Sequence, residues 1–496
     1  MRRRRLPFTV LVVIAGVLGA GIAFLVAGPM LAGHTKELLF VIAGGVGLVA
    51  ALSSLEVAMI GLVTISYVDG FLKGLIVSPI TVFAKDIVLA AGLIRWFWLG
   101  LTRQRWEALR LPVILPAFLF IIYCVAQMFN TETASPLVAL AGLRSWIVWI
   151  PVLVIAYDYM TTRAHIERML VTIVLLSLVT GIYAIVQYNI GFEHLYALSP
   201  GFSFYNRFTW GSGVRAVATF VAPGALGDAM SLSAIFCIGA VLYTRGKIWL
   251  KPLLIGTAAI CLVALATSGS RAPLLGLMVG GLGLLFLLRQ PRFIFTAVVI
   301  GILAVAVMDN YAGGAFEARY NPRMLSYQVV VNRVTGPLLG GIKSALETPL
   351  GVGVATGTGV GRGRLVVGQE AMVVKQTAGG MVENEYGRAL RELGFPGLAL
   401  FLWLLYAAVK MTVSSFMRVR TVESRSLIAA CLAVMLSGLA RLAVGSALYL
   451  VPGGPMFWLS GAVAVRTAEI ELARRQPMPG NMRQPEPRSH QFGTRQ

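Results

Sequence analysis

The chain has 496 residues, of which 57% are hydrophobic and 13% are charged, and its mean hydropathy is +0.79. Soluble domains carry about 25% charged residues, so this composition excludes an ordinary soluble enzyme and indicates a membrane protein. Lysine and arginine outnumber aspartate and glutamate by 42 to 21. In a membrane protein, such an excess of basic residues usually reflects the orientation in the membrane and the binding of anionic partners. We therefore do not expect nucleic acid as a ligand.

Apolar runs that are candidates to cross the bilayer recur along the chain, since about 20 apolar residues span the hydrocarbon. About fourteen candidates lie at 7–28, 37–53, 57–69, 80–99, 112–129, 138–158, 167–190, 224–243, 252–268, 272–288, 293–308, 394–413, 426–448 and 452–466. Several of these runs are short, so the sequence predicts an all-α polytopic protein with about 12 to 14 transmembrane helices.

The distribution of basic residues predicts the orientation. Arg2 to Arg5 precede a full-length apolar run without a small-residue cleavage site, so we expect a start-transfer anchor rather than a cleaved signal peptide. Basic residues then recur at alternate connections: Arg103, Arg105, Arg110, Arg163, Arg168, Arg245, Lys247, Lys251, Arg289, Arg292, Lys410, Arg418, Arg420, Arg425 and the tail from Arg466. By the positive-inside rule both termini are expected to be cytoplasmic.

This topology predicts four regions. Residues 1–308 form the first transmembrane helices and include an outer loop at 191–223. A large periplasmic loop follows at 309–384, then the last transmembrane helices at 385–475. The Pro- and Gln-rich tail at 476–496 lacks an apolar face, so we expect it to be disordered.

The large outer loop is long and basic. A stretch at 322–334 mixes polar and apolar residues at helical spacing, which predicts a short helix along the membrane face. The loop carries Arg319, Arg323, Arg333, Lys343, Arg362, Arg364 and Lys375. Basic outer loops are not favoured by insertion, so this charge indicates an anionic ligand, with Arg323 and Arg333 as secondary candidates. The alternative is that these charges merely solvate the loop.

Two arginines stand near predicted helix starts on the outer side. Arg215 precedes Pro223, and Arg271 lies in the first turn of the run at 272–288, where Ser268 or Ser270 can cap the helix. A cation near a helix amino terminus opposes the dipole at a cost of up to about 1 kcal/mol. A bound diphosphate would explain both placements, because guanidinium groups bind phosphate oxygens in pairs and the helix N–H groups add to the site. The alternative is that both side chains extend to the lipid headgroups.

A candidate general base lies where the large loop re-enters the membrane. Glu383 is followed by Asn384, Glu385 and Tyr386, and a carboxylate near arginines can accept a proton from an incoming hydroxyl. Glu385 and, less strongly, His194 compete for this role. A purely electrostatic role for Glu383 stays open.

Other features carry less chemistry. Arg441 lies in the middle of an apolar run, where a charge needs a partner, and Asp228 is a candidate. The glycine-rich stretch 351–363 lacks the lysine of a phosphate-binding loop, so we interpret it as a flexible loop. With four histidines, no clustered ligands and no paired cysteines, we expect no metal site, cofactor or disulfide framework.

Three segments give a family resemblance: RAVATFVAPGALGDAMSL from Arg215, TSGSRAPLLGL from Thr267, and ENEYGRALRELGFPGLALFLWLL from Glu383. With the ALETPLGVGVATG turn between them, the chain resembles the bacterial O-antigen ligase and polysaccharide polymerase superfamily of membrane glycosyltransferases. The resemblance implies that Arg215 and Arg271 bind the diphosphate of an undecaprenyl-diphosphate-linked glycan. Many ligases have a histidine where this chain has Glu383, which favours a polymerase of exopolysaccharide or O-antigen units.

The resemblance implies metal-independent transfer to a glycan or lipid acceptor at the periplasmic face of a bacterial inner membrane. Asn384 and Tyr386 would contact substrate, and Tyr205, Trp210 and Tyr386 could stack on sugars. Polysaccharide export or chain-length proteins are possible partners, besides membrane lipids. Alternatives are ligase-type transfer to a lipid or protein, a flippase for lipid-linked glycans, and a non-catalytic scaffold.

Overall fold

The computed structural model describes most of the chain. The described residues are 35–76, 79–103, 106–130, 136–210, 213–244, 250–289, 331–356, 365–367, 370–372, 384–445 and 447–475. The predicted spans at 7–28 and 293–308 and the tail at 476–496 therefore lie outside the described residues.

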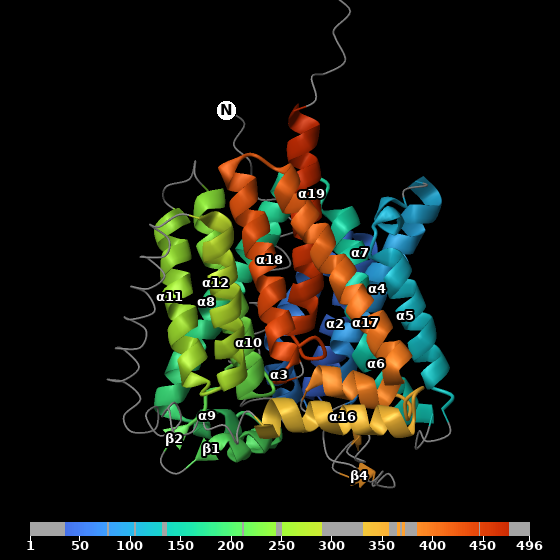
Figure 1. Cartoon of the computed structure of the whole chain (residues 1–496). Coiled ribbons are helices and arrows are strands. Elements are labelled where there is room, and N and C mark those ends of the chain that lie inside the picture. The colour runs from blue at the N-terminus through green and yellow to red at the C-terminus, as the bar shows by residue number, and fades with distance from the viewer. Residues whose placement is uncertain are drawn as a thin grey trace, which may run out of the picture.

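The fold is a bundle of antiparallel helices (Figure 1). Its long elements are α2 (Thr35–Ser53), α3 (Leu55–Leu75), α4 (Pro79–Arg103), α5 (Ile114–Gln127), α6 (Pro136–Ile147), α7 (Ile150–Tyr159), α8 (Arg163–Ile190), α10 (Pro223–Tyr243), α11 (Leu250–Thr267), α12 (Arg271–Leu288), α17 (Glu385–Arg418), α18 (Val422–Leu442) and α19 (Gly453–Arg475). The predicted all-α architecture is thus confirmed for the described residues.

One end of the bundle carries most of the short elements, and we call it the loop end (Figure 1). They are α9 (Glu193–Tyr196), η2 (Pro200–Phe208), β1 (Thr209–Trp210), β2 (Gly213–Val214), η4 (Val331–Thr335), α16 (Gly336–Glu347), β3 (Leu365–Val367) and β4 (Glu370–Met372). The strands form two small antiparallel hairpins, β1–β2 and β3–β4. At the opposite end lie η1 (Glu107–Arg110) and the last turn of α19.

Seven described helices are long and apolar enough to cross a membrane, and eight do so if the bent pair α6–α7 counts as one span. Each predicted span within the described residues coincides with a helix or with this pair. The chain is therefore a helical protein with several candidate membrane spans. The full number of spans and the side of each terminus stay predictions.

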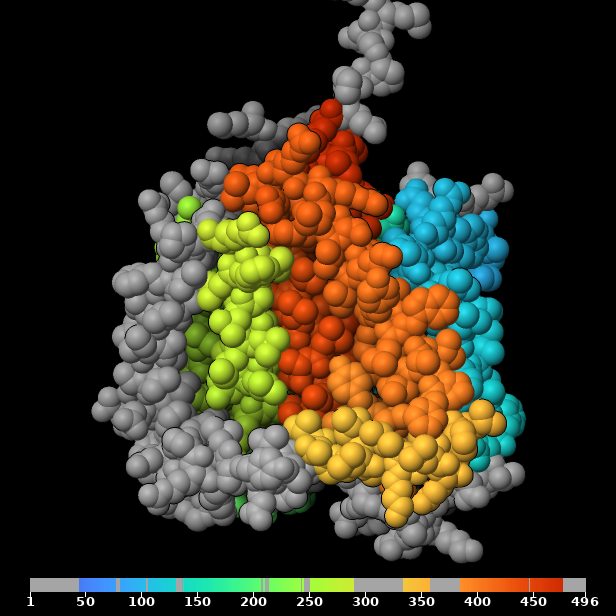
Figure 2. Space-filling model, viewed as in Figure 1, coloured from blue at the N-terminus to red at the C-terminus, as the bar shows by residue number. Residues whose placement is uncertain are grey.

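The C-terminal helices form the centre of the bundle, between the N-terminal and middle helices (Figure 2). In the spanning segments of α10 and α18, 83% and 78% of the residues are buried, whereas in that of α12 only 22% are buried. Small residues allow the central helices to approach: a Cβ built on Gly239 of α10 would lie 2.3 Å from the Cβ of Ala430 on α18. Close backbone approach of this kind is how membrane helices gain packing contacts.

Two helix boundaries differ from the sequence prediction. The apolar run expected to end at residue 448 leaves the helix at Leu442, because the chain then turns before α19. The span expected from residue 394 belongs to a longer helix that begins at Glu385 and kinks at Gly394, where φ is 66°. The apolar pattern marked the kink rather than the helix start.

Helix α16 crosses the loop end beside the first part of α17 (Figures 1 and 2). Glycine contacts make this possible, since a Cβ on Gly341 would lie 2.5 Å from the carbonyl oxygen of Gly387. Of the helix predicted at 322–334, only 331–334 are described, and they belong to η4, which leads directly into α16. The part at 322–330 lies outside the described residues.

Candidate functional site

Arg215 lies against the turn that connects α11 to α12. Its Nε donates to the carbonyl of Ser268 at 3.1 Å, and its Nη2 donates to the Ser270 hydroxyl at 2.8 Å and to the carbonyl of Gly269 at 3.4 Å. These carbonyls follow the carboxyl end of α11, where a cation is favoured. The expected dipole penalty therefore does not apply to Arg215.

Arg271 is the first residue of α12, as predicted. The expected serine cap is wrong: Ser270 makes no side-chain cap hydrogen bond, and the Ser268 hydroxyl donates to the Leu265 carbonyl at 2.5 Å. The Ser270 hydroxyl instead accepts a hydrogen bond from the guanidinium of Arg215. The structure thus brings the two predicted arginines to one turn, at a helix amino terminus without a side-chain cap.

Asn384 caps α17. Its Oδ1 accepts from the N–H groups of Tyr386 at 2.9 Å and Gly387 at 3.1 Å, and its Nδ2 donates to the carbonyls of Ala443 at 2.9 Å and Val334 at 3.3 Å. Only 1% of Asn384 is exposed. Its four hydrogen bonds give it a structural role, which explains its position better than substrate contact does.

Tyr386 and Arg333 lie beside this cap. The Tyr386 hydroxyl donates to the Leu439 carbonyl of α18 at 3.3 Å, so its ring is held against that helix. Arg333 is exposed in η4, next to the Val334 carbonyl that Asn384 binds. These three predicted residues therefore form a second group at the loop end.

The predicted base, Glu383, and Arg323 lie outside the described residues. The rival Glu385 is buried, with 2% exposed, and its Oε2 accepts from the Leu448 N–H at 3.3 Å. His194 contacts the hydroxyl of Tyr183 at 2.9 Å, and burial lowers the pKa of its imidazole. Glu385 is thus enclosed by protein, whereas His194 is half-buried.

Two of the sequence motifs meet at the kink in α17. The turn after Pro349 runs along the kink: Phe395 N–H donates to the Pro349 carbonyl at 3.0 Å, and Gly353 N–H donates to the Glu392 carbonyl at 3.1 Å. Gln127 of α5 holds the same turn through the Leu350 carbonyl at 2.7 Å. The start of the glycine-rich stretch, which was expected to be a flexible loop, is thus held by backbone hydrogen bonds to α17. Residues 357–363 lie outside the described residues.

Sequence reasoning missed a buried ion pair in this motif. Arg388 Nε and Nη2 donate to the two carboxylate oxygens of Glu392 at 3.1 and 3.3 Å, and Trp146 Nε1 donates to Glu392 at 2.8 Å. The Arg388 guanidinium also lies over the Trp146 ring, 4.2 Å from its centroid. A signal existed, because oppositely charged residues four apart in an apolar helix indicate a pair.

Arg441 connects the two groups of predicted residues. It lies in the last turn of α18, not in the middle of a span as expected, and it forms the predicted ion pair with Asp228 of α10. The same stretch of α18 accepts the Tyr386 hydroxyl, and Ala443 just after it accepts Asn384. On the other side, Gly276 of α12 packs against the Arg441 side chain.

Of the other two aromatic candidates, Tyr205 differs from expectation. Tyr205 is fully buried, and its hydroxyl donates to the Phe220 carbonyl at 2.7 Å, so its ring cannot stack on a sugar. The side chain of Trp210 lies outside the described residues. Among the described residues, no group of three or more His, Cys, Asp or Glu side chains is arranged to hold a metal ion.

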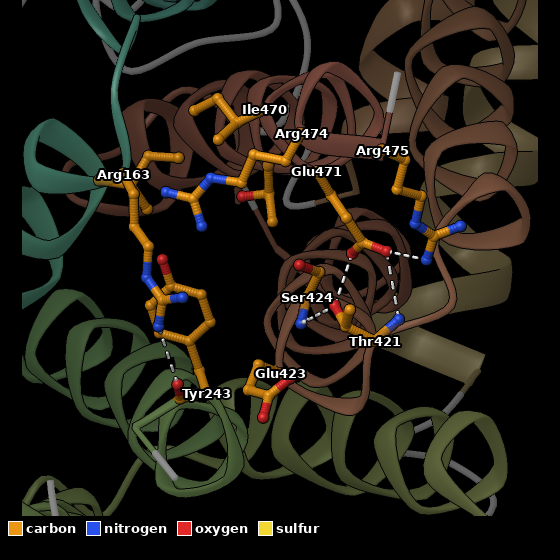
Figure 3. A pocket seen from close by; sticks show the side chains of 11 residues that line it. Arg163, Tyr243, Thr421, Glu423, Ser424, Ile470, Glu471, Arg474 and Arg475 are labelled. Atoms are coloured by element: carbon orange, nitrogen blue, oxygen red, sulfur yellow. Dashed lines mark hydrogen bonds and ion pairs between the residues drawn. The ribbon is translucent and has the colours of Figure 1, made fainter. Parts of the chain in front are cut away.

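A cavity of about 180 Å³ lies at the opposite end, between α8, α10, α18 and α19 (Figure 3). Most of its charges are paired: Arg475 contacts Glu471, which also binds Thr421, and Arg163 donates to the Tyr243 carbonyl at 3.4 Å. By rise per residue, Thr467, the cavity residue nearest the start of α19, lies about 21 Å from Gly453. It is too far away to belong to the arginine site.

The chain matches no protein-family model and no curated protein.

Proposed function

We propose that the chain is a membrane glycosyltransferase that acts on a lipid-diphosphate-linked glycan. The observation that carries the proposal is the meeting of Arg215 and Arg271 at the uncapped start of α12. Guanidinium groups and the N–H groups of a helix amino terminus are the kinds of donor that bind a diphosphate, and Arg215 uses Nε and Nη2 to hold the turn that carries Arg271. The resemblance to O-antigen ligases and polysaccharide polymerases supports the same function.

In the proposed reaction, an acceptor hydroxyl attacks the anomeric carbon of the donor sugar and gives its proton to Glu383. The bond from that carbon to the diphosphate breaks in the same displacement. Arg215 and Arg271 stabilise the charge that develops on the leaving lipid diphosphate, so it needs no protonation. The reaction as written uses neither nucleotide nor metal ion.

We propose further that the loop end faces the periplasm and that the acceptor is the growing glycan, which makes the chain a polymerase. A ligase would transfer the glycan once, to a separate lipid or protein. These two activities share the site and differ only in the acceptor.

The test is reconstitution with a short lipid-diphosphate-linked oligosaccharide, in the presence of chelator and without nucleotide, followed by gel and mass analysis. Arg215→Ala or Arg271→Ala should lower the rate by about 10²–10³-fold, as for loss of one oxyanion donor. Glu383→Gln should lower it by about 10²–10⁴-fold. Arg289→Ala, at the exposed other end of α12, is the matched control and should retain activity.

A ladder of products identifies a polymerase, and a single addition to another acceptor identifies a ligase. Intact donor that moves between leaflets of the vesicle would overturn the proposal in favour of a flippase.

A further inference from the structure

Arg441 has donors that no described residue satisfies. Its Nη1 is ion-paired with Asp228 Oδ1, and only 2% of the residue is exposed. Its Nε and Nη2 have no hydrogen-bond acceptor among the described residues. A buried charged donor without an acceptor is costly, so this edge of the guanidinium gains free energy from any acceptor that reaches it.

Nε and Nη2 are the two parallel donors on one edge of a guanidinium, and this edge binds two oxygens of one oxyanion. Arg388 shows the same edge filled. It is equally buried, and its Nε and Nη2 donate to the two oxygens of Glu392 at 3.1 and 3.3 Å. At Arg441 no described side chain supplies the corresponding pair of oxygens.

A second donor lies beside the Arg441 side chain. The hydroxyl of Ser437, one turn earlier on α18, is fully buried and also lacks a partner among the described residues. Gly276 adjoins both side chains: a Cβ there would lie 2.7 Å from Ser437 Oγ and 2.6 Å from Arg441 Cδ. A Cβ on Gly453, at the start of α19, would lie 3.1 Å from Arg441 Nη2. The two glycines thus let the backbones of α12 and α19 approach Ser437 and Arg441 without placing a side chain against them.

The attraction for an oxyanion comes from unsatisfied donors and helix ends, since Asp228 already balances the single charge of Arg441. The buried carboxylate of Glu385 is bonded to the Leu448 N–H. Gly276 lies in the second turn of α12, whose uncapped amino terminus carries Arg271. The amino terminus of α19 therefore lies at Arg441, and that of α12 lies about one turn from its contact with Arg441.

We propose that the Nε–Nη2 edge of Arg441 and the Ser437 hydroxyl bind a phosphate-class oxyanion, and that Asp228 holds the guanidinium in position. The identity of the ligand rests on the proposed function: in that reaction the oxyanion is one phosphate of the lipid diphosphate. Arg441 is then a third arginine of the donor site, after Arg215 and Arg271.

The test measures binding of inorganic pyrophosphate to purified full-length protein in detergent, by calorimetry. Arg441→Lys keeps the charge and the ion pair with Asp228 but removes the paired donors, so we expect affinity to fall at least 10-fold. Ser437→Ala should weaken binding about 2- to 5-fold without disturbing the ion pair. Arg388→Lys is the matched control, because its edge is already filled by Glu392, and its affinity should match the wild type.

Wild-type affinity in both Arg441→Lys and Ser437→Ala would overturn the inference. If Arg441→Lys does not fold, as judged by gel filtration and thermal unfolding, unchanged affinity in Ser437→Ala alone would overturn it. Competition by inorganic phosphate or by phosphatidylglycerol in nanodiscs separates a free phosphate site from a headgroup site.

Transfer assays separate this inference from the proposed function. If the wild type binds pyrophosphate through Arg441 but does not transfer glycan, the proposed function is contradicted and the oxyanion site is supported. If Arg441→Lys transfers glycan with a wild-type KM for the donor, the oxyanion site is contradicted and the proposed function is supported.

Discussion

Gly394 determines how the re-entry motif meets the glycine-rich turn. Its φ of 66° lies in the left-handed region, and a Cβ there would lie 2.1 Å from the Pro349 carbonyl oxygen. For both reasons, a side chain at this position would cost substantial free energy. The kink and the docked turn thus depend on one residue.

We therefore expect Gly394→Ala to lower the free energy of unfolding by at least about 2 kcal/mol, through strain and collision. Thermal unfolding in detergent measures this as a lower midpoint. Gly281→Ala in α12 is the control: no atom lies within 4 Å of its Cβ, so alanine should be neutral or should stabilise the helix by up to about 1 kcal/mol. Equal midpoints for the two variants would contradict the assignment of the kink.

Asn384 allows a structural role to be separated from substrate contact. Alanine removes the cap of α17 and should cost about 1–2 kcal/mol, whereas aspartate keeps an oxygen for the Tyr386 and Gly387 N–H groups. We expect Asn384→Asp to be more stable than Asn384→Ala, and both folded proteins to keep the wild-type KM for the donor. A large rise in KM with normal stability would instead support the substrate contact predicted from sequence.

The contact between α18 and α19 depends on Glu471. Its carboxylate accepts from the N–H groups of Arg420 at 3.1 Å and Thr421 at 3.2 Å and from the Thr421 hydroxyl at 2.6 Å, so α19 caps the start of α18. Burial alone would raise the pKa of Glu471. These hydrogen bonds, with one from Ser424, outweigh burial and lower the pKa from 4.5 to about 2.

Because the folded pKa is lowered, the stabilisation is complete above about pH 4.5 and is lost as the pH falls toward about 2. Glu471→Gln should therefore lower the unfolding free energy by about 1–3 kcal/mol at pH 7. The difference in unfolding free energy between this variant and the wild type should decrease as the pH falls from about 5 to about 3, and thermal unfolding curves measure it. Glu423→Gln, in the same cavity, is the control and should show little change. A gap independent of pH would show that the charge of Glu471 is not what matters.

Much of the bundle follows from apolar runs and turn residues, because a helix in lipid must be apolar over a fixed length. Arg271 was placed correctly for the same reason, since a run of small and apolar residues announces its helix. The partners of buried charges were harder to predict. Trp146 and Glu392 are 246 residues apart, and Arg215 faces the end of α11 rather than the helix that follows it. Such contacts depend on how helices pack, which one sequence does not specify.

The orientation of the whole molecule rests on arginines at the end opposite the loop end, and native cysteines make it testable. All four cysteines are buried, so they give little background to a maleimide that cannot cross membranes. Leu346, 69% exposed on α16, and Arg474, exposed at the end of α19, mark the two ends. If the basic end is cytoplasmic, Leu346→Cys should react in intact spheroplasts, whereas Arg474→Cys should react only after permeabilisation. The reverse pattern would put the arginine site on the cytoplasmic side, where a periplasmic transferase could not use it.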